Sequence, residues 1–319
     1  MKTLKFLLLA LLPCIAFSQA KVGTAGGQFL EIGVGARAVG MGGAFSATSN
    51  DISAVYYNPG GLGALEGHEA MFTHISYFAD MSFEYGAFSM PINSTGGVAA
   101  ISISSLNTGD IDETTPSHPE GTGRTFNANS VAAGLTYSQM LTDRFSCGVT
   151  WKFINEKYAD VSARSWAVDI GTIYRTAFHD LRIGIGVTNF GPDLTFISLP
   201  APLPMSFHLG LAAEVIENDH HTLTVAFDMS HPNDDLEKFR LGTEYWYDKK
   251  YALRAGFMAK PDSAGSFAEL PGTGMHFVHY NLGAGFKIPI SAYVLKVDYA
   301  LEDRYWLDIE HRFTFGLEF

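Results

Sequence analysis

The sequence predicts an all-β protein: an antiparallel transmembrane β-barrel of about fourteen strands, preceded by a small segment that contains short helices and fills the lumen. Three observations predict this fold. The last strand is apolar on one face and polar on the other, the chain begins like an exported protein, and the connections between strands alternate between short and long. Together they favour a barrel in a bacterial outer membrane.

The first 20 residues have the composition of a secretory signal peptide. Lys2 and Lys5 precede an apolar run over residues 6–17, and small residues offer a cleavage site between Ser18 and Ala20. This run is too short for a membrane-spanning helix, and no stretch of about 18 apolar residues follows it. We therefore expect residues 1–20 to be removed from an exported protein.

The cysteine content and the net charge further narrow the class of protein. Cys14 follows Pro13, where a lipoprotein signal has a small residue, so lipidation is disfavoured. Cleavage leaves Cys147 as the only cysteine, which excludes an intrachain disulfide. Loss of Lys2 and Lys5 lowers Lys plus Arg from 21 to 19 against 33 acidic residues, a net charge of −14. That sign argues against nucleic acid as a partner.

Residues 21–66 lack the alternation of a strand. Asn50 is suited to cap a short helix over residues 52–57, and Pro59 ends it. The glycines of residues 33–43 allow close backbone packing or positive φ. Because this segment is too small to fold alone, we predict that it fills the barrel lumen as a plug, here called the hatch.

From about His68 onward, apolar and polar side chains alternate almost without interruption, so residues 67–319 are predicted to form the barrel. The first three strands are less regular than the others. The predicted strands are residues 70–78, 81–90, 98–106, 130–138, 145–153, 166–175, 181–188, 205–215, 223–229, 239–247, 251–257, 280–288, 293–299 and 311–319.

The last strand gives the clearest signal. Its apolar face carries Phe313, Phe315, Leu317 and Phe319. Its polar face carries Arg312, Thr314, Gly316 and Glu318. Such a strand places lipid outside and water or polar protein inside. A strand that ends in Phe also resembles the recognition signal of outer-membrane proteins, so we expect the barrel-assembly machinery to bind this strand through Phe319.

Connection lengths provide an independent test. The predicted periplasmic turns are short, at residues 93–96, 141–143, 177–180, 217–220, 247–250 and 289–291. The predicted outer connections are longer, at residues 107–124, 157–163, 191–204, 231–237, 260–274 and 302–308. Only the first outer connection, near residues 79–80, is short. Alternation alone also fits a soluble all-β protein with half-buried sheets, but such a protein has no reason to sort its connections in this way.

The hatch carries two sequence motifs that resemble a known family. The matching residues are Ala36, Arg37, Gly40, Met41, Gly42, Gly43, Ala44, Asp51, Ala54, Val55, Tyr56, Tyr57, Asn58 and Pro59. These motifs resemble the N-terminal hatch of the PorV/PorQ family, within the FadL-like group of fourteen-stranded outer-membrane barrels. The similarity continues through residues 166–171 and 189–191 to the last strand. Gly60 departs from the family's usual Asn-Pro-Ala run.

The resemblance implies a role in type IX secretion, by which Bacteroidetes-type Gram-negative bacteria export and attach surface proteins. It therefore implies outer-membrane lipid, secretion-system subunits and exported cargo proteins as partners. It leaves open whether the chain is PorV-like, PorQ-like or another paralogue.

Motifs for catalysis or cofactor binding are weak. Residues 33–38 match the loose dinucleotide pattern G-x-G-x-x-A but lack a preceding strand and a βαβ context. There is no G-x-S-x-G, H-E-x-x-H or cysteine pair. The possible metal sets are His220 with His221, His276 with His279, and Asp228 with His231, Asp234 and Asp235, and each is better explained by a turn, a strand end or a solvated loop. We predict no catalytic, metal or cofactor site.

Charged residues of both signs share the predicted lumen face. They are Glu84, Asp169, Arg175, Arg182, Glu214, Asp228, Arg240, Glu244, Arg254, Lys287, Lys296, Asp298, Arg312 and Glu318. Mixed signs indicate pairing with each other and with the hatch, not the single-sign ring of a selective pore. Large apolar residues are predicted to point inward too: Phe72, Phe78, Phe88, Ile173, Trp246 and Met258. These either pack against the hatch or line a hydrophobic ligand pocket.

Two functions therefore remain. One is a non-catalytic secretion or attachment component that recognises exported proteins through its outer loops. The other is a FadL-like channel for small hydrophobic compounds. The same architecture serves both.

Overall fold

The computed structural model describes residues 23–77, 79–178, 180–260, 279–303 and 309–319. The predicted signal peptide, Phe78, His276 and most of the connections at 260–274 and 302–308 lie outside the described residues.

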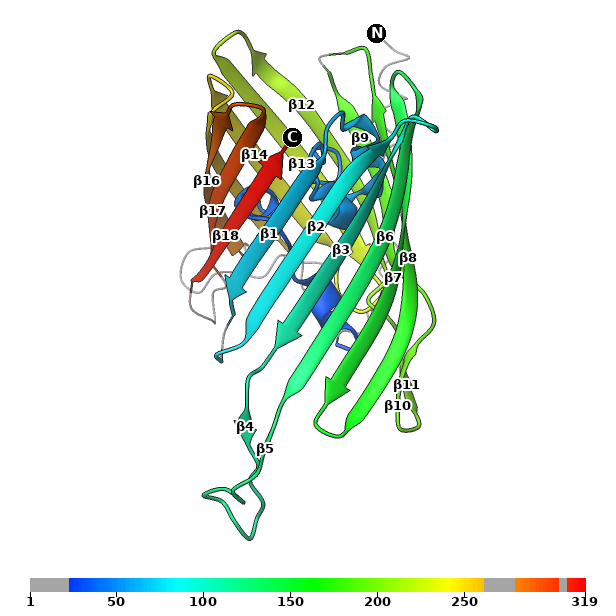
Figure 1. Cartoon of the computed structure of the whole chain (residues 1–319), viewed down its shortest axis with the longest axis vertical. Helices are drawn as coiled ribbons and strands as arrows, with labels where there is room; N and C mark the ends of the chain where they lie inside the picture. Colours follow the sequence, from blue (N-terminus) through cyan, green and yellow to red (C-terminus); the bar gives the residue numbers. More distant parts are fainter. Residues whose placement is uncertain (1–22, 78, 179, 261–278, 304–308) are drawn as a thin grey trace, which may run out of the picture.

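Fourteen antiparallel strands close into a barrel, as the sequence predicts (Figure 1). The barrel closes where β1 pairs with β18, with Phe72 opposite Phe315. The barrel strands are β1 (Glu69–Ser76), β2 (Ser82–Ile92), β3 (Gly97–Asn107), β6 (Ala128–Thr142), β7 (Phe145–Tyr158), β8 (Val161–Arg175), β9 (Arg182–Phe190), β12 (Ser206–Glu217), β13 (His221–Pro232), β14 (Lys238–Tyr247), β15 (Tyr251–Ala259), β16 (His279–Ile290), β17 (Tyr293–Glu302) and β18 (Glu310–Glu318).

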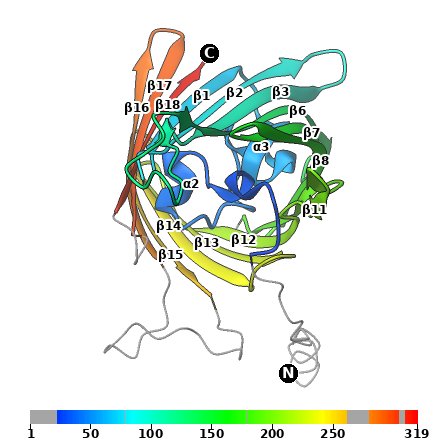
Figure 2. The same cartoon turned by 90° about the horizontal axis from the view of Figure 1, so that it is seen from below.

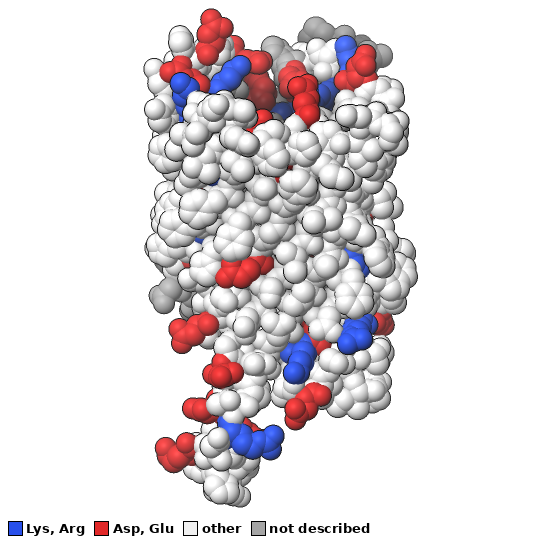
Figure 3. Space-filling model, in the orientation of Figure 1, with Lys and Arg blue, Asp and Glu red and all other residues white. Residues whose placement is uncertain are grey.

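Side chains alternate between an apolar outer face and a small or polar inner face. On β6 and β7, Leu135 and Val149 are 57% and 47% exposed. Their neighbours Thr136 and Thr150 are buried inside and hydrogen-bond to each other at 2.8 Å. On the face of the barrel seen in Figure 3, this alternation gives a broad, mostly uncharged band, with charged side chains gathered toward both ends. This band is the surface that lipid covers.

The two ends of the barrel differ in their connections. Tight turns gather at the end where β18 finishes, which in outer-membrane barrels is the periplasmic end (Figure 1). From the opposite, outer end, an arm over residues 108–127 projects beyond the barrel. The arm carries β4 (Ile111–Asp112) and β5 (Thr125–Phe126), and a second hairpin between β9 and β12 carries β10 (Leu194–Phe196) and β11 (Leu199–Ala201).

One predicted outer connection is wrong. Residues 157–163 do not form a long loop, because β7 and β8 stay paired as far as Tyr158 and Val161. Only Ala159 and Asp160 remain in the turn. The polar residues here belong to strands that continue past the apolar band.

Four short helices of the hatch lie inside the barrel. They are η1 (Gln28–Glu31), α2 (Ala36–Gly40), α3 (Ala54–Tyr57) and η2 (Pro59–Ala64). Viewed along the axis, α2 and α3 lie within the ring of strands (Figure 2). The helix predicted over residues 52–57 is α3, but its N-cap is Ser53 and not Asn50. Among the described residues, no helix has the length and apolar character needed to cross a membrane.

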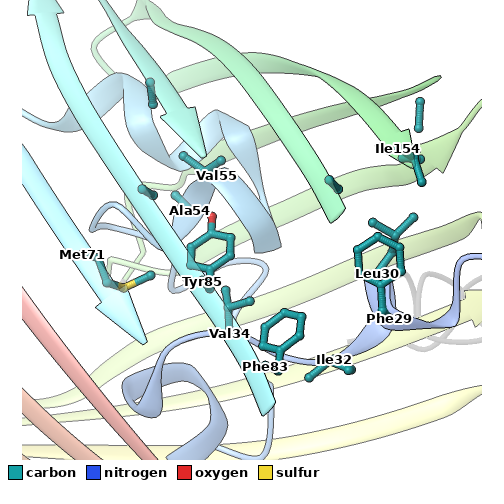
Figure 4. Packing of buried hydrophobic residues seen from close by; sticks show 14 of the residues in the cluster. Phe29, Leu30, Ile32, Val34, Ala54, Val55, Met71, Phe83, Tyr85 and Ile154 are labelled. Carbon is teal, nitrogen blue, oxygen red and sulfur yellow. The ribbon is translucent and has the colours of Figure 1, made fainter. Parts of the chain in front are cut away.

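One side of the hatch packs against β1, β2 and β3 through apolar side chains (Figure 4). The hatch contributes Phe29, Leu30, Ile32 and Val34, each at most 7% exposed. The strands contribute Met71, Ile75, Phe83 and Tyr85. Burial of one large apolar side chain stabilises a fold by about 1.5–3 kcal/mol, so this contact is a major attachment of the hatch.

Three residues predicted to face inward on these strands face outward. Phe72 is 50% exposed, and Phe88 stacks with Phe319 on the outer surface. Glu84 is also outside, where its carboxylate lies 2.6 Å from His74. The prediction fails because β1 and β2 meet an apolar part of the hatch. Their inner faces are therefore as apolar as their outer faces, and polarity does not identify the lumen side.

Candidate functional site

Arg37 of α2 joins the hatch to the opposite side of the barrel. Its guanidinium donates two hydrogen bonds to Glu244 of β14, at 2.8 and 2.7 Å. It also donates to Asn50 and Asp51 of the hatch, at 2.6 and 2.7 Å, and lies over the ring of Phe45. One basic side chain thus holds two parts of the hatch against one strand.

Further ion pairs connect Glu244 to the neighbouring strands of the barrel wall. Arg254 of β15 donates to Glu244 at 2.8 Å and to Asp298 of β17 at 2.6 Å. The guanidinium of Arg254 and the ammonium group of Lys287 both lie over the ring of Trp246. Opposite charges alternate from Asp51 to Asp298, so the buried charges largely neutralise one another.

Asp51 belongs to a second set of contacts near the periplasmic end. Burial alone would raise the pKa of the Asp51 carboxyl, but Arg37 and Lys296 outweigh burial and hold that pKa below its usual value. Lys296 in turn donates to Glu69 at 3.0 Å, and the other oxygen of Glu69 accepts the N–H of Ile52 at 2.9 Å. The hatch carboxylate therefore remains ionised within the lumen.

The wall also binds hatch backbone directly. One carboxylate oxygen of Asp228 accepts the N–H groups of Phe45 and Ser46, at 2.9 and 2.8 Å. The hydroxyl of Thr314 accepts the N–H of Ala36 at 2.8 Å. These N–H groups lie outside regular helix or strand ladders, and the wall satisfies them.

Arg312 of β18 is the largest fully buried side chain of the barrel wall, at 1% exposure. It donates to the carbonyl oxygen of Gly33 in the hatch and to the carboxylates of Glu302 and Glu310. The polar face of the terminal strand therefore binds the hatch, whereas its phenylalanines face lipid.

Inward glycines let the hatch backbone approach the wall. A Cβ atom at Gly171 of β8 would collide with Asn58 and Pro59, and one at Gly148 of β7 with the Pro59 backbone. Asn58 donates to the carbonyl oxygens of Ser46 and Thr172, at 2.7 and 3.0 Å. Only glycine allows this approach, which explains the alternation of glycine with apolar residues on these strands.

The glycines at the end of α2 also allow the hatch backbone to lie close to the wall. Gly42 and Gly43 have φ of 67° and 76°, a region that favours glycine. Gly40 lies so close to Gly283 of β16 that a Cβ would sit 3.0 Å from the Gly283 Cα. Met41 is completely buried between Gly242 and Gly256. The predicted hatch residues thus contact two parts of the wall: Gly40 and Met41 meet β14 to β16, and Asn58 and Pro59 meet β7 and β8.

The remaining predicted lumen charges also lie inside. Arg182 of β9 pairs with Glu214 of β12 at 2.5 Å, and Asp169 of β8 pairs with Lys152 at 2.8 Å. Arg240 donates to Ser230 at 2.8 Å, and Arg175 lines a small recess at the periplasmic end of the hatch. Of the set, only Glu84 lies outside. The prediction omitted Lys152 and Glu69, although both occupy inward positions in alternating strands.

An outer cavity of about 570 Å³ lies between the hatch and the wall. Its lining on the hatch side includes Phe29, Ile32 and Tyr56. The predicted inward residue Met258 also lines it, and the wall adds polar groups such as His208. The other predicted inward residues Ile173 and Trp246 pack elsewhere in the lumen.

Among the described residues, no group of three or more His, Cys, Asp or Glu side chains is arranged to hold a metal ion. His220 lies 2.5 Å from Asp248, and His221 hydrogen-bonds to Tyr245 at 2.7 Å. His231 pairs with Glu237 at 3.1 Å. These histidines therefore have local partners at a turn and a strand end.

The family model for the type IX secretion system protein PorV matches residues 16–232. Solved structures with a similar fold include the monoaromatic hydrocarbon channel CymD, with 14% identity, a TM-score of 0.57, and coverage of 90% of this chain and 97% of that one. The Pseudomonas putida toluene transporter TodX gives the same four values. A Pseudomonas aeruginosa FadL homologue is 12% identical with a TM-score of 0.54, covering 89% of this chain and 97% of that one. No curated protein matches the chain. The structural matches show the fold alone.

Proposed function

The chain belongs to the family of the type IX secretion system protein PorV, and we propose that it is a non-catalytic outer-membrane component that recognises exported proteins at the cell surface. The observation that carries this proposal is the division of the molecule into a lumen filled by a bonded hatch and an outer end with projecting loops. A plugged lumen favours a docking role for the outer surface.

We further propose how the protein reaches the membrane. Residues 1–20 act as a cleaved signal peptide, residues 21–66 form the hatch and residues 67–319 the barrel, in a Bacteroidetes-like bacterium. The barrel-assembly machinery recognises the terminal strand. The backbone of Phe319 exchanges hydrogen bonds with His68, at 2.9 and 3.0 Å, so the end of the last strand also marks where the hatch meets the barrel.

The outer loops should be the recognition surface. Residues 107–124 project furthest, and residues 191–204 carry the second hairpin; residues 260–274 complete the proposed set. Shortening the first two should lower the retention of exported proteins at the cell surface, measured by surface labelling. Heat-modifiable electrophoretic mobility should show that the barrel remains folded. Normal retention after both deletions would contradict loop recognition.

The cavity supports a second candidate function, a channel for small hydrophobic compounds. The similar structures of CymD and TodX are hydrocarbon channels or transporters by name, and the cavity has an apolar lining on the hatch side. In this case Phe29→Asn or Tyr56→Asn should abolish uptake. Phe72 and Phe88 are not suitable probes because both face lipid.

A deletion strain separates the two functions. It should be scored for display of surface proteins and for growth on hydrophobic carbon sources. We expect loss of display with normal growth. Loss of uptake with normal display would instead support the channel and contradict the secretion role.

A further inference from the structure

The outer ends of β7 and β8 carry two cations on the face that points away from the lumen. Lys157 and Arg164 are both exposed, and Asn155 lies directly opposite Arg164 in the strand register. Two residues closer to the membrane on the same face of these strands, Phe153 lies opposite Trp166. The order along the outer wall is therefore aromatic residues first, then the two cations.

The aromatic pair marks the level of the lipid boundary. Phe153 and Trp166 are 45% and 46% exposed on the apolar band, and aromatic residues gather where that band meets lipid headgroups. Figure 3 shows basic side chains over the lower ends of β6, β7 and β8, where the uncharged band gives way to charges of both signs. Lys157 and Arg164 thus lie at headgroup height in the outer leaflet.

The two cations differ from those inside the barrel. Arg37, Arg254 and Lys152 are each paired with carboxylates. Among the described residues, Lys157 and Arg164 are not paired with a carboxylate. Arg164 donates through its Nε to the side-chain oxygen of Asn155 at 3.2 Å. That contact orients the guanidinium and leaves its terminal nitrogens for another acceptor.

We propose that this cluster, Asn155, Lys157 and Arg164, binds the phosphate groups of phosphorylated glycolipids in the outer leaflet. A guanidinium binds phosphate oxygens in pairs, and a lysine adds a point charge beside it. The acyl chains of the same lipid rest on Phe153 and Trp166. In a chain with a formal net charge of −12, a local excess of positive charge facing lipid fits an anionic headgroup.

Binding of lipid A to the purified, detergent-solubilised full chain tests this site. Native mass spectrometry should compare the wild type with Lys157→Gln/Arg164→Gln. Each cation near an anionic lipid surface contributes about fivefold in affinity, so the double variant should bind lipid A at least about tenfold more weakly. The control is Lys249→Gln/Lys250→Gln, which removes two exposed lysines at the periplasmic turn between β14 and β15 and should bind normally.

Two further arms identify the ligand. Lipid A treated with phosphatase should bind the wild type as weakly as intact lipid A binds the double variant. Inorganic phosphate should compete poorly, because it lacks chains to rest on the aromatic pair. Three results would overturn the proposal. The first is equal binding of lipid A by the Lys157→Gln/Arg164→Gln variant and by the control variant. The others are undiminished binding of the dephosphorylated lipid and efficient competition from inorganic phosphate. Heat-modifiable mobility confirms that each variant is folded.

Discussion

The two walls of the lumen hold the hatch by different physical means. The polar wall, β13 to β18, uses ion pairs and carboxylate–amide hydrogen bonds, with Arg37–Glu244 at its centre. The apolar wall, β1 to β3, uses side-chain packing around Phe83 and Tyr85. Ion pairs fix geometry, whereas apolar burial supplies stabilisation without direction. A hatch held in both ways has a defined orientation as well as a stable contact.

Removal of the whole hatch tests whether both walls enclose it. Deletion of residues 22–66 should leave a folded barrel with large new ion conductance, because the plug and its contacts disappear together. Single-channel recording in planar bilayers measures this effect. A truncated barrel that folds yet stays closed would show that other residues block the lumen.

Loss of Arg37 should damage the polar wall selectively. Arg37→Ala removes the ion-pair partner of Asp51 and leaves Glu244 paired with Arg254 alone, and breaking a buried pair costs about 3–5 kcal/mol. We expect intermittent conductance and protease cleavage of the hatch, with the barrel intact. The control is Arg175→Ala, which removes a lumen arginine at the periplasmic end that lines a recess. Equal effects of the two substitutions would argue against the special role of the Arg37–Glu244 pair.

Loss of Phe83 should damage the apolar wall. Phe83 is 1% exposed and contacts the hatch cluster, so Phe83→Ala should lower the free energy of unfolding by about 3 kcal/mol. Phe72→Ala on the neighbouring strand removes the same side chain from the lipid face and should cost less. Urea titration in lipid vesicles compares them. A larger loss for Phe72 would reverse the assignment of the two faces.

The two walls also show how far sequence reasoning reaches. On the polar wall, alternation separates Phe313 from Arg312 and correctly places the charges inside, because lipid and hatch differ in polarity there. On the apolar wall, lipid outside and Phe29 or Leu30 inside present the same environment. Alternation then does not identify the inner face, and the sequence-based prediction wrongly places Phe72, Phe88 and Glu84 in the lumen.

Some features of the contact between hatch and wall are visible only in the three-dimensional structure. Arg37 is the only basic residue of the described hatch, so a carboxylate in the lumen is expected as its partner, but the sequence does not identify Glu244. The role of Gly148 and Gly171 depends on which hatch atoms meet them, and spacing along the chain does not contain that information. The extension of β7 and β8 past the apolar band was also missed, because the polar residues at 157–163 resemble those of a loop.

Glu84 gives the smallest and most discriminating test. It lies outside, its side chain is 37% exposed, and its partner His74 is 46% exposed. Exposed pairs contribute about 0–1 kcal/mol, so Glu84→Leu should change the free energy of unfolding by about 1 kcal/mol or less. Glu244→Leu, the matched change on the polar wall, removes the carboxylate that Arg37 and Arg254 share and leaves them only Asp51 and Asp298 as partners, so it should cost about 3–5 kcal/mol. Urea titration of both variants in vesicles measures the difference. Similar losses would mean that Glu84 supports the hatch from inside, and that the apolar wall also depends on charge.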